Sequence, residues 1–251
     1  MKVPDRKQIL LFSFLSIVVL GITIPLNMYL SHNGDELLKG WPHRLTDEDD
    51  SVIEIKPTKP KAWSSLSGIS PYAQAAIVLS EDWSFFQHEG FDSEQMKVAL
   101  EEAASGGRVR GASTITQQMV KNVWLTEERS LWRKLHELIL AYKVDGELTK
   151  KKILEVYLNV IEFGPKIYGI TKAARHYFGK SPSQLSPRES AFLAMMLPSP
   201  KRYYVSFKKK KLTAFAKVRI EQILVKMRQG KAITPEQFTE EVASRFSWEI
   251  P

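Results

Sequence analysis

Two adjacent carboxylates stand just before two phenylalanines and a histidine in the segment EDWSFFQHEG, residues 81–90. A carboxylate beside apolar rings loses solvation, which raises its pKa and suits it to general acid or base catalysis. Glu81-Asp82 could therefore do chemistry, or it could be a solvated helix end or half of a metal site. A metal site is the weakest of the three, because the sequence has no histidine pair of the H-E-x-x-H kind. The residues alone leave the catalytic and structural interpretations open.

A second segment, GASTITQQ at residues 111–118, is rich in neutral hydrogen-bonding side chains. Hydroxyl residues followed by two amides suit a carbohydrate, whose ring carries many uncharged hydroxyl groups. The alternative is a Gly-Ser turn with an N-cap that opens a helix over residues 115–124. Both interpretations stand at this point.

Basic residues crowd around this second segment in the sequence. Arginine and lysine side chains are the groups that bind phosphate or pyrophosphate. Glu137 follows Arg133 by four residues and Lys134 by three, so all three can share one helix face. A solvated basic face with surface ion pairs would have the same spacing. The residues concerned are Arg108, Arg110, Lys121, Arg129, Arg133 and Lys134.

The elements that must hold these side chains are predicted to be helices. Apolar residues recur at intervals of three and four, and several of these runs begin with an N-cap or capping-box pattern such as Ser70-Pro71 or Ser186 with Glu189. Leu131, Leu135 and Tyr142 belong to an apolar stripe that we expect to face the core. Helices are predicted over residues 71–81, 92–106, 115–124, 131–142, 150–158, 187–197, 212–227 and 235–243.

Composition limits the class of protein. The chain has 251 residues, is 43% hydrophobic and carries a formal charge of +8 with a pI near 9.4. It can fill a core, and its charge suits nucleic acid, anionic lipid or a phosphate-bearing substrate. The absence of cysteine excludes disulfides and thiolate metal sites.

The N-terminus predicts a membrane anchor. Three basic residues precede an uncharged apolar run over residues 9–30, about 22 residues against the roughly 20 that span a bilayer as a helix. A cleavable signal peptide has a shorter apolar region. The basic flank favours a cytoplasmic N-terminus, which places the rest of the chain outside the cytoplasm and weakens the nucleic-acid interpretation.

Three parts are therefore expected along the chain. Residues 1–30 would form a cytoplasmic tip and the transmembrane anchor, and residues 31–69 a linker and irregular lead-in with one strand at residues 52–55. Residues 70–251 would form the main domain. The fold class predicted for this domain is mainly α, since no series of alternating strands is present.

Five segments, taken in this order, resemble glycosyltransferase family 51, the peptidoglycan polymerases. The resemblance covers roughly residues 71–203, and no transpeptidase signature follows it, as in the monofunctional biosynthetic transglycosylases. One departure is that family members often carry a second glycine shortly after the F-G of the long fourth segment, where this chain has Pro165-Lys166. The segments are EDWSFFQHEGFD, GASTITQQMVKN, RKLHE, KKILEVYLNVIEFGPKIYGITKAARHYFGK and LSPRESAFLAMMLPSP.

The resemblance implies a lysozyme-like helical glycosyltransferase domain behind one transmembrane helix. The substrate would be lipid II, polymerised into glycan strands with inversion and release of undecaprenyl pyrophosphate. Such an enzyme is expected in the cytoplasmic (inner) membrane, with a periplasmic catalytic domain. Its expected partners are the growing glycan chain, the membrane and other proteins of wall synthesis or division, with no nucleic acid. The sequence requires no cofactor, although a divalent Mg or Mn ion could sit at the pyrophosphate.

The resemblance also gives roles to single residues. Glu81 matches the essential glutamate and is expected to be the general base, while Glu137 matches a second glutamate at the donor site. Asp82 is expected to shape the turn, and His88 to be structural beside Phe85 and Phe86 as wall and core. Sugar or phosphate oxygens would be held by Ser113, Thr114, Gln117, Gln118, Lys121, Asn122, Arg129, Arg133 and Lys134.

Two other functions stay open. A lytic transglycosylase would share the helical fold and a catalytic glutamate but would cleave glycan, and it would need no cluster of pyrophosphate-binding cations. A catalytically silent scaffold of the wall-synthesis machinery would need neither Glu81 nor Glu137. The two glutamates and the cations favour the polymerase.

Overall fold

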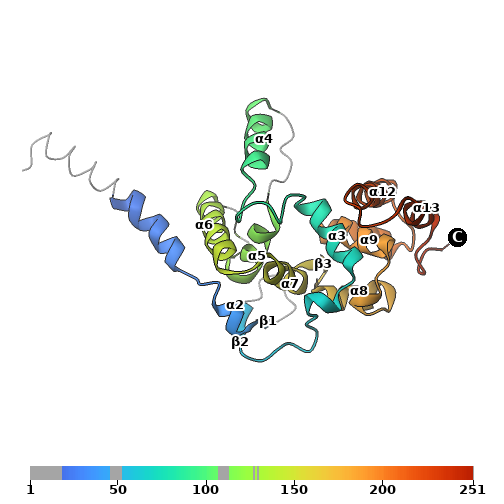
Figure 1. The fold of residues 1–251 in the computed structure, drawn as a ribbon, viewed down its shortest axis with the longest axis horizontal. Helices are drawn as coiled ribbons and strands as arrows, with labels where there is room; N and C mark the ends of the chain where they lie inside the picture. Colours follow the sequence, from blue (N-terminus) through green and yellow to red (C-terminus); the bar gives the residue numbers. More distant parts are fainter. Residues whose placement is uncertain (1–18, 46–52, 107–112, 127, 129, 251) are drawn as a thin grey trace, which may run out of the picture.

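The chain folds mainly into helices, in agreement with the predicted class (Figure 1). The computed structural model describes residues 19–45, 53–106, 113–126, 128 and 130–250. Within them, residues 19–30 are helical. The other longer helices are α3 (Pro71–Glu81), α4 (Ser93–Ala104), α5 (Ile115–Trp124), α6 (Leu131–Glu147), α7 (Lys150–Val160), α8 (Ile170–Phe178), α9 (Pro187–Met196), α12 (Ala214–Gln229) and α13 (Pro235–Ala243).

The helix starts are those that local side-chain chemistry predicts. Thr114, Ser186 and Thr234 each accept a hydrogen bond from the backbone N–H three residues on, and the glutamine or glutamate at that third position accepts one from the cap backbone. These capping boxes satisfy backbone N–H groups that would otherwise lack partners. Ser70 differs, because its hydroxyl donates to the Leu185 carbonyl at 2.9 Å and so joins the start of α3 to the segment before α9.

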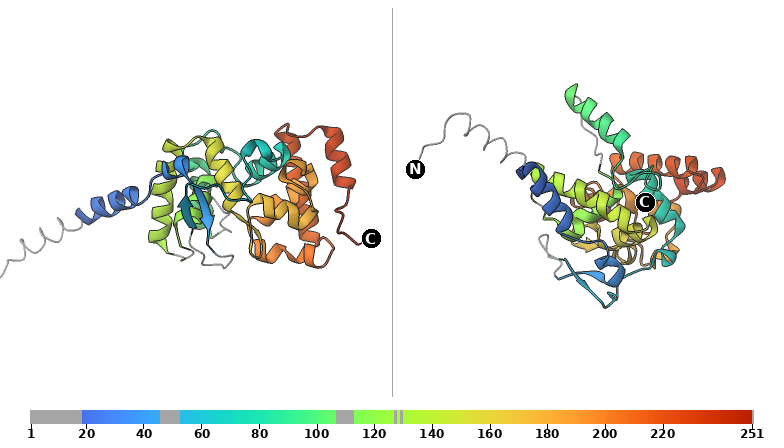
Figure 2. Two further views of the ribbon diagram at one scale, coloured as in Figure 1. Left: turned by 90° about the horizontal axis from the view of Figure 1, so that it is seen from below. Right: turned by 60° about the vertical axis from the view of Figure 1, so that its left-hand side comes forward.

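Two groups of helices build the core. Helix α3 packs against α9 and α12, and α5 packs against α6 and α7. Fully buried side chains such as Ile77, Met119, Tyr157 and Phe192 fill the space between them. The N-terminal helical segment and α13 lie at opposite ends of the molecule (Figures 1 and 2).

The predicted buried stripe of α6 is wrong. Leu131 is 89% exposed and Tyr142 is 52% exposed. The buried face instead runs through Glu137, Leu140 and Val144 and faces α5. A hydrophobicity pattern misses this face because a carboxylate occupies one of its central positions, where paired cations compensate its burial.

Short strands were under-predicted. The strand expected near residue 53 is β2 (Ile53–Lys56), and it pairs antiparallel with β1 (Trp41–Arg44), whose proline and charged residues do not alternate. A second pair, β3 (Glu162–Gly164) and β4 (Ile167–Tyr168), closes a tight hairpin. Three short helices, α2 (Glu36–Lys39), α10 (Pro200–Tyr203) and α11 (Val205–Lys208), and two 3-10 turns, η1 (Leu66–Gly68) and η2 (Pro182–Gln184), complete the described elements.

The segment before α3 is attached to the helical core. Trp63 Nε1 donates to Glu155 of α7 at 3.0 Å, and the Ser64 N–H donates to Asn159 Oδ1 of the same helix at 2.8 Å. Leu37 of α2 is fully buried. Burial of apolar and paired polar groups at these points orders much of the stretch that precedes α3.

The end of the N-terminal helical segment docks on α6. Lys143 Nζ donates to the carbonyls of Tyr29 at 2.8 Å and His32 at 2.6 Å, so it caps the last turn with a positive charge. The anchor prediction falls partly on residues 1–18, outside the described chain. Among the residues that the structure does describe, no helix has the length and apolar character needed to cross a bilayer.

Gly169, at the start of α8, offers a test of how closely α8 packs against α7. Its φ is +84°, and a Cβ there would lie 2.6 Å from the Asn159 carbonyl oxygen. Gly169→Ala should therefore lower the free energy of unfolding by about 2 kcal/mol or more, from left-handed strain and a backbone clash together. Urea titration of the purified variant measures the loss.

Gly106→Ala is the matched control, because Gly106 has a φ of +71° and a Cβ added there would meet nothing within 4 Å. Gly106→Ala should lower the free energy of unfolding only by the conformational strain, about 1 kcal/mol. An equal loss in both variants would show that the contact with α7 is unimportant.

Candidate active site

Glu81 is the last residue of α3, and its carboxylate is partly buried. Burial raises the pKa of Glu81, although a hydrogen bond from Gln118 and the charges of Arg219 and Lys226 act in the opposite direction. Its position at a helix C-terminus adds no stabilisation to a negative charge. The net shift is upward, so the carboxyl accepts a proton more readily than an ordinary glutamate, which is the direction that a general base requires.

Gln118 of α5 connects Glu81 to the core. Its Nε2 donates to Glu81 Oε2 at 3.1 Å, and its Oε1 accepts from the Tyr157 hydroxyl at 2.9 Å. Tyr157 is fully buried, and burial holds its pKa well above the usual value, so the hydroxyl stays protonated and donates. A donor on one side of the amide fixes its orientation, so the NH₂ group must face the carboxylate.

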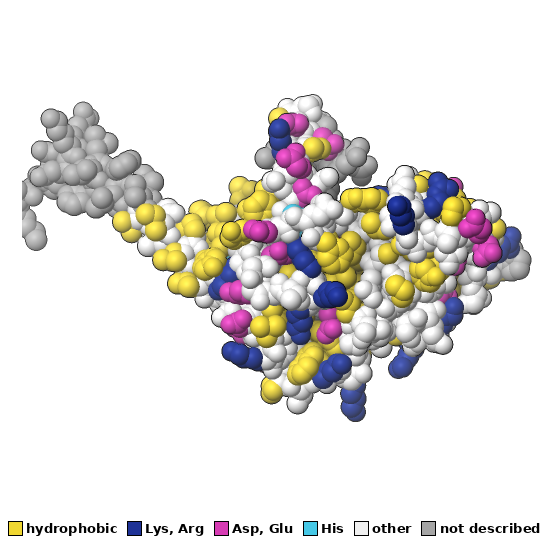
Figure 3. Space-filling view, in the orientation of Figure 1, with side chains coloured by type: hydrophobic (Ala, Val, Ile, Leu, Met, Phe, Trp, Pro, Cys, Tyr) yellow, Lys and Arg dark blue, Asp and Glu magenta, His cyan; other side chains and the backbone are white. Residues whose placement is uncertain are grey.

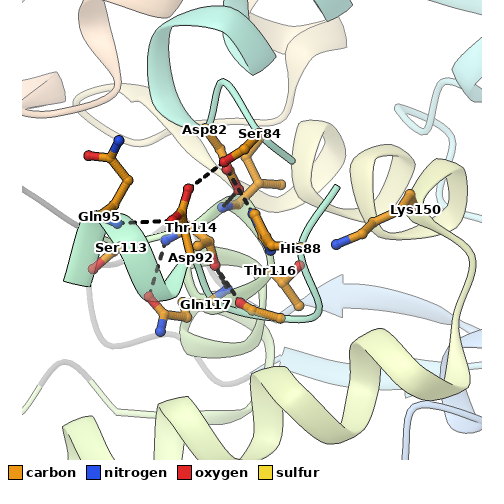
Figure 4. A network of polar contacts seen from close by, with 12 residues as sticks. Asp82, Ser84, His88, Asp92, Gln95, Ser113, Thr114, Thr116, Gln117 and Lys150 are labelled. Carbon is orange, nitrogen blue, oxygen red and sulfur yellow. Dashed lines mark hydrogen bonds and ion pairs between the residues drawn. The ribbon is translucent and has the colours of Figure 1, made fainter. Parts of the chain in front are cut away.

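Asp82 holds the turn beside this carboxylate, as predicted (Figure 4). Its Oδ1 lies 2.8 Å from His88 Nε2, and its Oδ2 accepts the Ile115 N–H at 2.9 Å. Asp82 is therefore a buried link from the end of α3 to the first turn of α5. Phe85 is fully buried as predicted, but Phe86 is 59% exposed and does not belong to the core.

A second cluster lies at the start of α6. Glu137 is only 3% exposed and is paired with Arg133 at 2.6 Å and with Lys134. Lys134 Nζ also donates to Ser113 Oγ at 3.0 Å. Nearly half of the Lys134 side chain remains open to solvent, so the cluster presents an exposed cation that is ion-paired with a buried carboxylate.

The two glutamates belong to one hydrogen-bonded network. Gln118 Nε2, which contacts Glu81, also lies 3.4 Å from the Ser113 carbonyl oxygen, and Ser113 Oγ is bound to the Lys134 of the Glu137 cluster. The structure thus joins residues from α3, α5 and α6 that lie up to 56 positions apart in sequence, since 137 − 81 = 56. A carboxylate of raised pKa and a cation cluster face the same part of the molecule.

The remaining predicted binding residues are placed differently. Thr114 and Gln117 are buried in the α5 capping box, and Thr114 Oγ1 also donates to the Gly90 carbonyl at 2.6 Å (Figure 4). Asn122 Nδ2 donates to the Gln118 carbonyl on its own helix at 2.8 Å. Lys121 is partly buried on α5, and Arg129 lies outside the described residues. Direct substrate binding by these residues stays a prediction.

Sequence reasoning missed two cations near Glu81. Arg219 and Lys226 lie on α12, and their charges act on the Glu81 carboxylate because α12 packs against α3. The two residues are seven positions apart, which places them on one helix face. The seven-residue spacing could have indicated a basic face on this helix. It could not have indicated that this face lies near Glu81, because that depends on how α12 packs against α3.

A divalent ion has no protein-supplied ligand set among the described residues, where no three of His, Cys, Asp and Glu lie close enough to hold a metal. Glu137, the acid of the cation cluster, is already paired with Arg133 and Lys134. The expected Mg or Mn ion therefore remains a prediction.

Comparison with known proteins places this chain in a family. A family model described as transglycosylase matches residues 49–228, and the chain belongs to that family. A Laribacter hongkongensis protein named biosynthetic peptidoglycan transglycosylase is 38% identical to this chain over 199 residues, which cover 74% of this chain and 87% of that protein. A Shewanella oneidensis protein of the same name is 41% identical over 198 residues, which cover 78% of this chain and 83% of that protein. A Brucella suis protein of the same name is 46% identical over 140 residues, 56% of this chain and 62% of the relative's length.

Glu81→Gln should make folding less sensitive to pH. Because the pKa of Glu81 is raised in the folded state, ionisation carries a cost to folding that is absent while both states are protonated. This cost grows as pH rises from the unfolded-state pKa through the raised folded-state pKa. Glutamine carries no charge, so the gain in unfolding free energy of the variant over wild type should be larger at about pH 8 than at about pH 4.

Urea titrations of both proteins at the two pH values measure this difference. A gain that is the same at both values, or larger in acid, would contradict a raised pKa at Glu81.

Proposed function

We propose that this chain is a peptidoglycan glycosyltransferase that polymerises lipid II into glycan strands and releases undecaprenyl pyrophosphate. The observation that carries the proposal is the network from Glu81 through Gln118 and Ser113 to Lys134. It sets a proton acceptor at one end and cations for a phosphate leaving group at the other. The names of the relatives support the same chemistry.

The proposed reaction joins the 4-hydroxyl oxygen of one GlcNAc to C1 of the MurNAc at the reducing end of the growing chain. Glu81 takes the hydroxyl proton as the new O–C1 bond forms on the face opposite the leaving group, so the anomeric configuration inverts. The bond from C1 to the pyrophosphate oxygen breaks, and its electron pair leaves with the pyrophosphate. A positioned base is needed because a sugar hydroxyl is a poor nucleophile near neutral pH.

The cation cluster would stabilise the leaving group. Negative charge develops on the pyrophosphate as the bond breaks, and fixed cations lower the energy of that transition state. Lys134 is partly exposed and held by Glu137 and Ser113, so it is the best-placed donor of the described cluster. Arg133, on the same helix face, is held by the same carboxylate.

A membrane position follows from the lipid tail of the proposed substrate. Apolar side chains gather on the N-terminal helical segment and the adjoining part of the domain (Figure 3), and Leu131 and Trp132 of α6 are 89% and 62% exposed beside the cation cluster. We extend the proposal to a single-pass anchor in the inner membrane with a periplasmic, lysozyme-like catalytic domain. Lys143 would couple that anchor to α6, the helix that carries the donor cations.

The polymerase is favoured over a lytic enzyme by the paired cations. Cleavage of glycan to anhydro-sugar releases no pyrophosphate and gains nothing from Lys134 and Arg133 held on a buried glutamate. A silent scaffold would not need a carboxyl with a raised pKa, which is a cost to folding.

Glu81→Gln should lower the rate of lipid II polymerisation by about 10²–10⁴-fold, the usual contribution of a general base. The assay uses the full chain in detergent with labelled lipid II, and gel separation of the glycan products. Glu89→Gln is the matched control, because Glu89 is a glutamate of the same segment that takes no part in the network. It should leave the rate within about twofold of wild type.

Normal glycan formation by the Glu81 variant would overturn the assignment of the base. Release of anhydro-muropeptides from sacculi by the wild type, with no glycan made from lipid II, would overturn the polymerase itself.

A further inference from the structure

The N-terminal helical segment projects from the body of the molecule (Figure 1), and its end contacts α5 and α6 through polar and aromatic side chains. Lys143 of α6, which caps the last turn, has a side chain that is only 8% exposed. Its ammonium also lies 4.9 Å from the centre of the Tyr29 ring and 3.9 Å from Glu147 Oε1. A buried ammonium is costly without such partners, so this lysine ties the segment to α6.

The chain that follows the last turn approaches α6 closely. The Gly34 N–H donates to Glu147 Oε2 at 2.7 Å, and a Cβ at Gly34 would lie 2.8 Å from the same oxygen. Ser31 Oγ donates to the Met28 carbonyl at 2.7 Å and lies 2.8 Å from His136 Nε2. Because the single hydroxyl proton goes to the carbonyl, the imidazole Nε2–H is the donor to Ser31. Residues 28–34, together with the side chains of α5 and α6 that they contact, are called the junction below.

Two histidine rings lie at the centre of the junction. His32 stacks on Trp124 of α5, with ring centroids 5.7 Å apart and planes inclined by 22°. It also stacks on His136 of α6, with centroids 6.5 Å apart and planes inclined by 20°. Both histidines are partly buried. The N-terminal helical segment is therefore docked on the domain through a pair of titratable rings that face each other.

The charged groups that act on His32 come from α2 and α6. Burial is the largest influence and lowers the pKa of His32. The Glu36 carboxylate of α2 opposes this shift, whereas His136 and Lys143 of α6 add to it. The contact from α5, Trp124, is uncharged. The docked environment thus favours the neutral form of this ring.

His136 has a similar environment on α6. Burial lowers its pKa, and a hydrogen bond with the Met28 carbonyl acts in the opposite direction. Two acids of α6 already have partners, because Glu147 accepts a hydrogen bond within the junction and Glu137 is held by the cation cluster. Two protonated rings at this separation would repel each other, and the Lys143 ammonium would add to the repulsion.

We propose that the junction is a pH-sensitive clasp, in which the N-terminal helical segment is docked on α5 and α6 while His32 and His136 are neutral and is released when both rings are protonated. Helix α6 also carries Arg133 and Lys134 of the cation cluster, so release separates the segment from a helix of the candidate active site. The clasp concerns the docking of the segment and does not depend on the proposed reaction.

The direction of the pH dependence follows from the protons bound in the two states. A released histidine has the ordinary pKa of about 6.5, and a docked one has a lower pKa. Between these two values the released state binds more protons, so the docked state loses stability as pH falls through this window. Above about pH 7.5 the rings are neutral in both states and docking no longer depends on them.

The test measures the distance between two spin labels by pulsed electron–electron double resonance, on the full chain in uncharged detergent. The chain has no cysteine of its own, so Leu26→Cys on the N-terminal helical segment and Lys151→Cys on α7 supply two exposed labelling positions. The distance distribution should be narrow at about pH 8. At about pH 5.5 a broad second population should appear, and the ratio of released to docked molecules should rise by about tenfold or more.

The histidine variants locate the source of this response. In His32→Gln with His136→Gln, labelled in the same way, the ratio should agree within about twofold at the two pH values, because glutamine does not titrate. His43→Gln with His176→Gln is the matched control and should keep the full response. It removes two histidines outside the junction, one bound to the Thr58 carbonyl at 2.6 Å and the other with a lowered pKa of its own on α8.

Lys143→Met shows that the labels report release. It removes the donor to the two carbonyls of the last turn, so the broad population should be present at both pH values. The proposal would be overturned by a wild-type distribution that is the same at both pH values, by an equal response in the two double histidine variants, or by a Lys143→Met protein that stays docked at about pH 8.

Discussion

Two of the hydrogen bonds of the Gln118 amide connect the fold to its proposed chemistry. One side accepts from Tyr157, which is fully buried among the core helices, and the other donates to Glu81 at the edge of that core. Because the tyrosine remains protonated, the amide has one stable orientation and the carboxylate has a fixed neighbour. The position of the base therefore depends on the packing of α5 between α6 and α7.

The site concentrates charges that the fold must compensate. Glu137 is buried on α6 and is held by two cations, whereas Glu81 accepts a hydrogen bond from the Gln118 amide and has a pKa that burial raises. The first arrangement stabilises a fixed cation cluster, and the second keeps a carboxyl able to accept a proton. The different environments of the two glutamates are what give them different proposed roles.

Much of this arrangement could be predicted from sequence. The capping residues Ser186 and Thr234, and the helices that they start, were predictable because the capping interaction is local. The buried face of α6 was not, since it contains Glu137, and the approach of Arg219 to Glu81 was not, since it depends on tertiary packing. The capping roles of Thr114 and Gln117 show that one residue pattern can fit both a ligand and a helix start.

The central claim is that Glu81 is a buried base held by Gln118, and the pKa of its carboxyl tests this most directly. Carbon-detected NMR of protein labelled at the glutamate carboxyls, with Glu81→Gln to assign the signal, measures it in wild type and in Gln118→Leu. We predict a pKa above the usual glutamate range in wild type and a higher one in the variant, which loses the hydrogen bond that favours the ionised form. An ordinary pKa in wild type, or a lower one in the variant, would contradict the account.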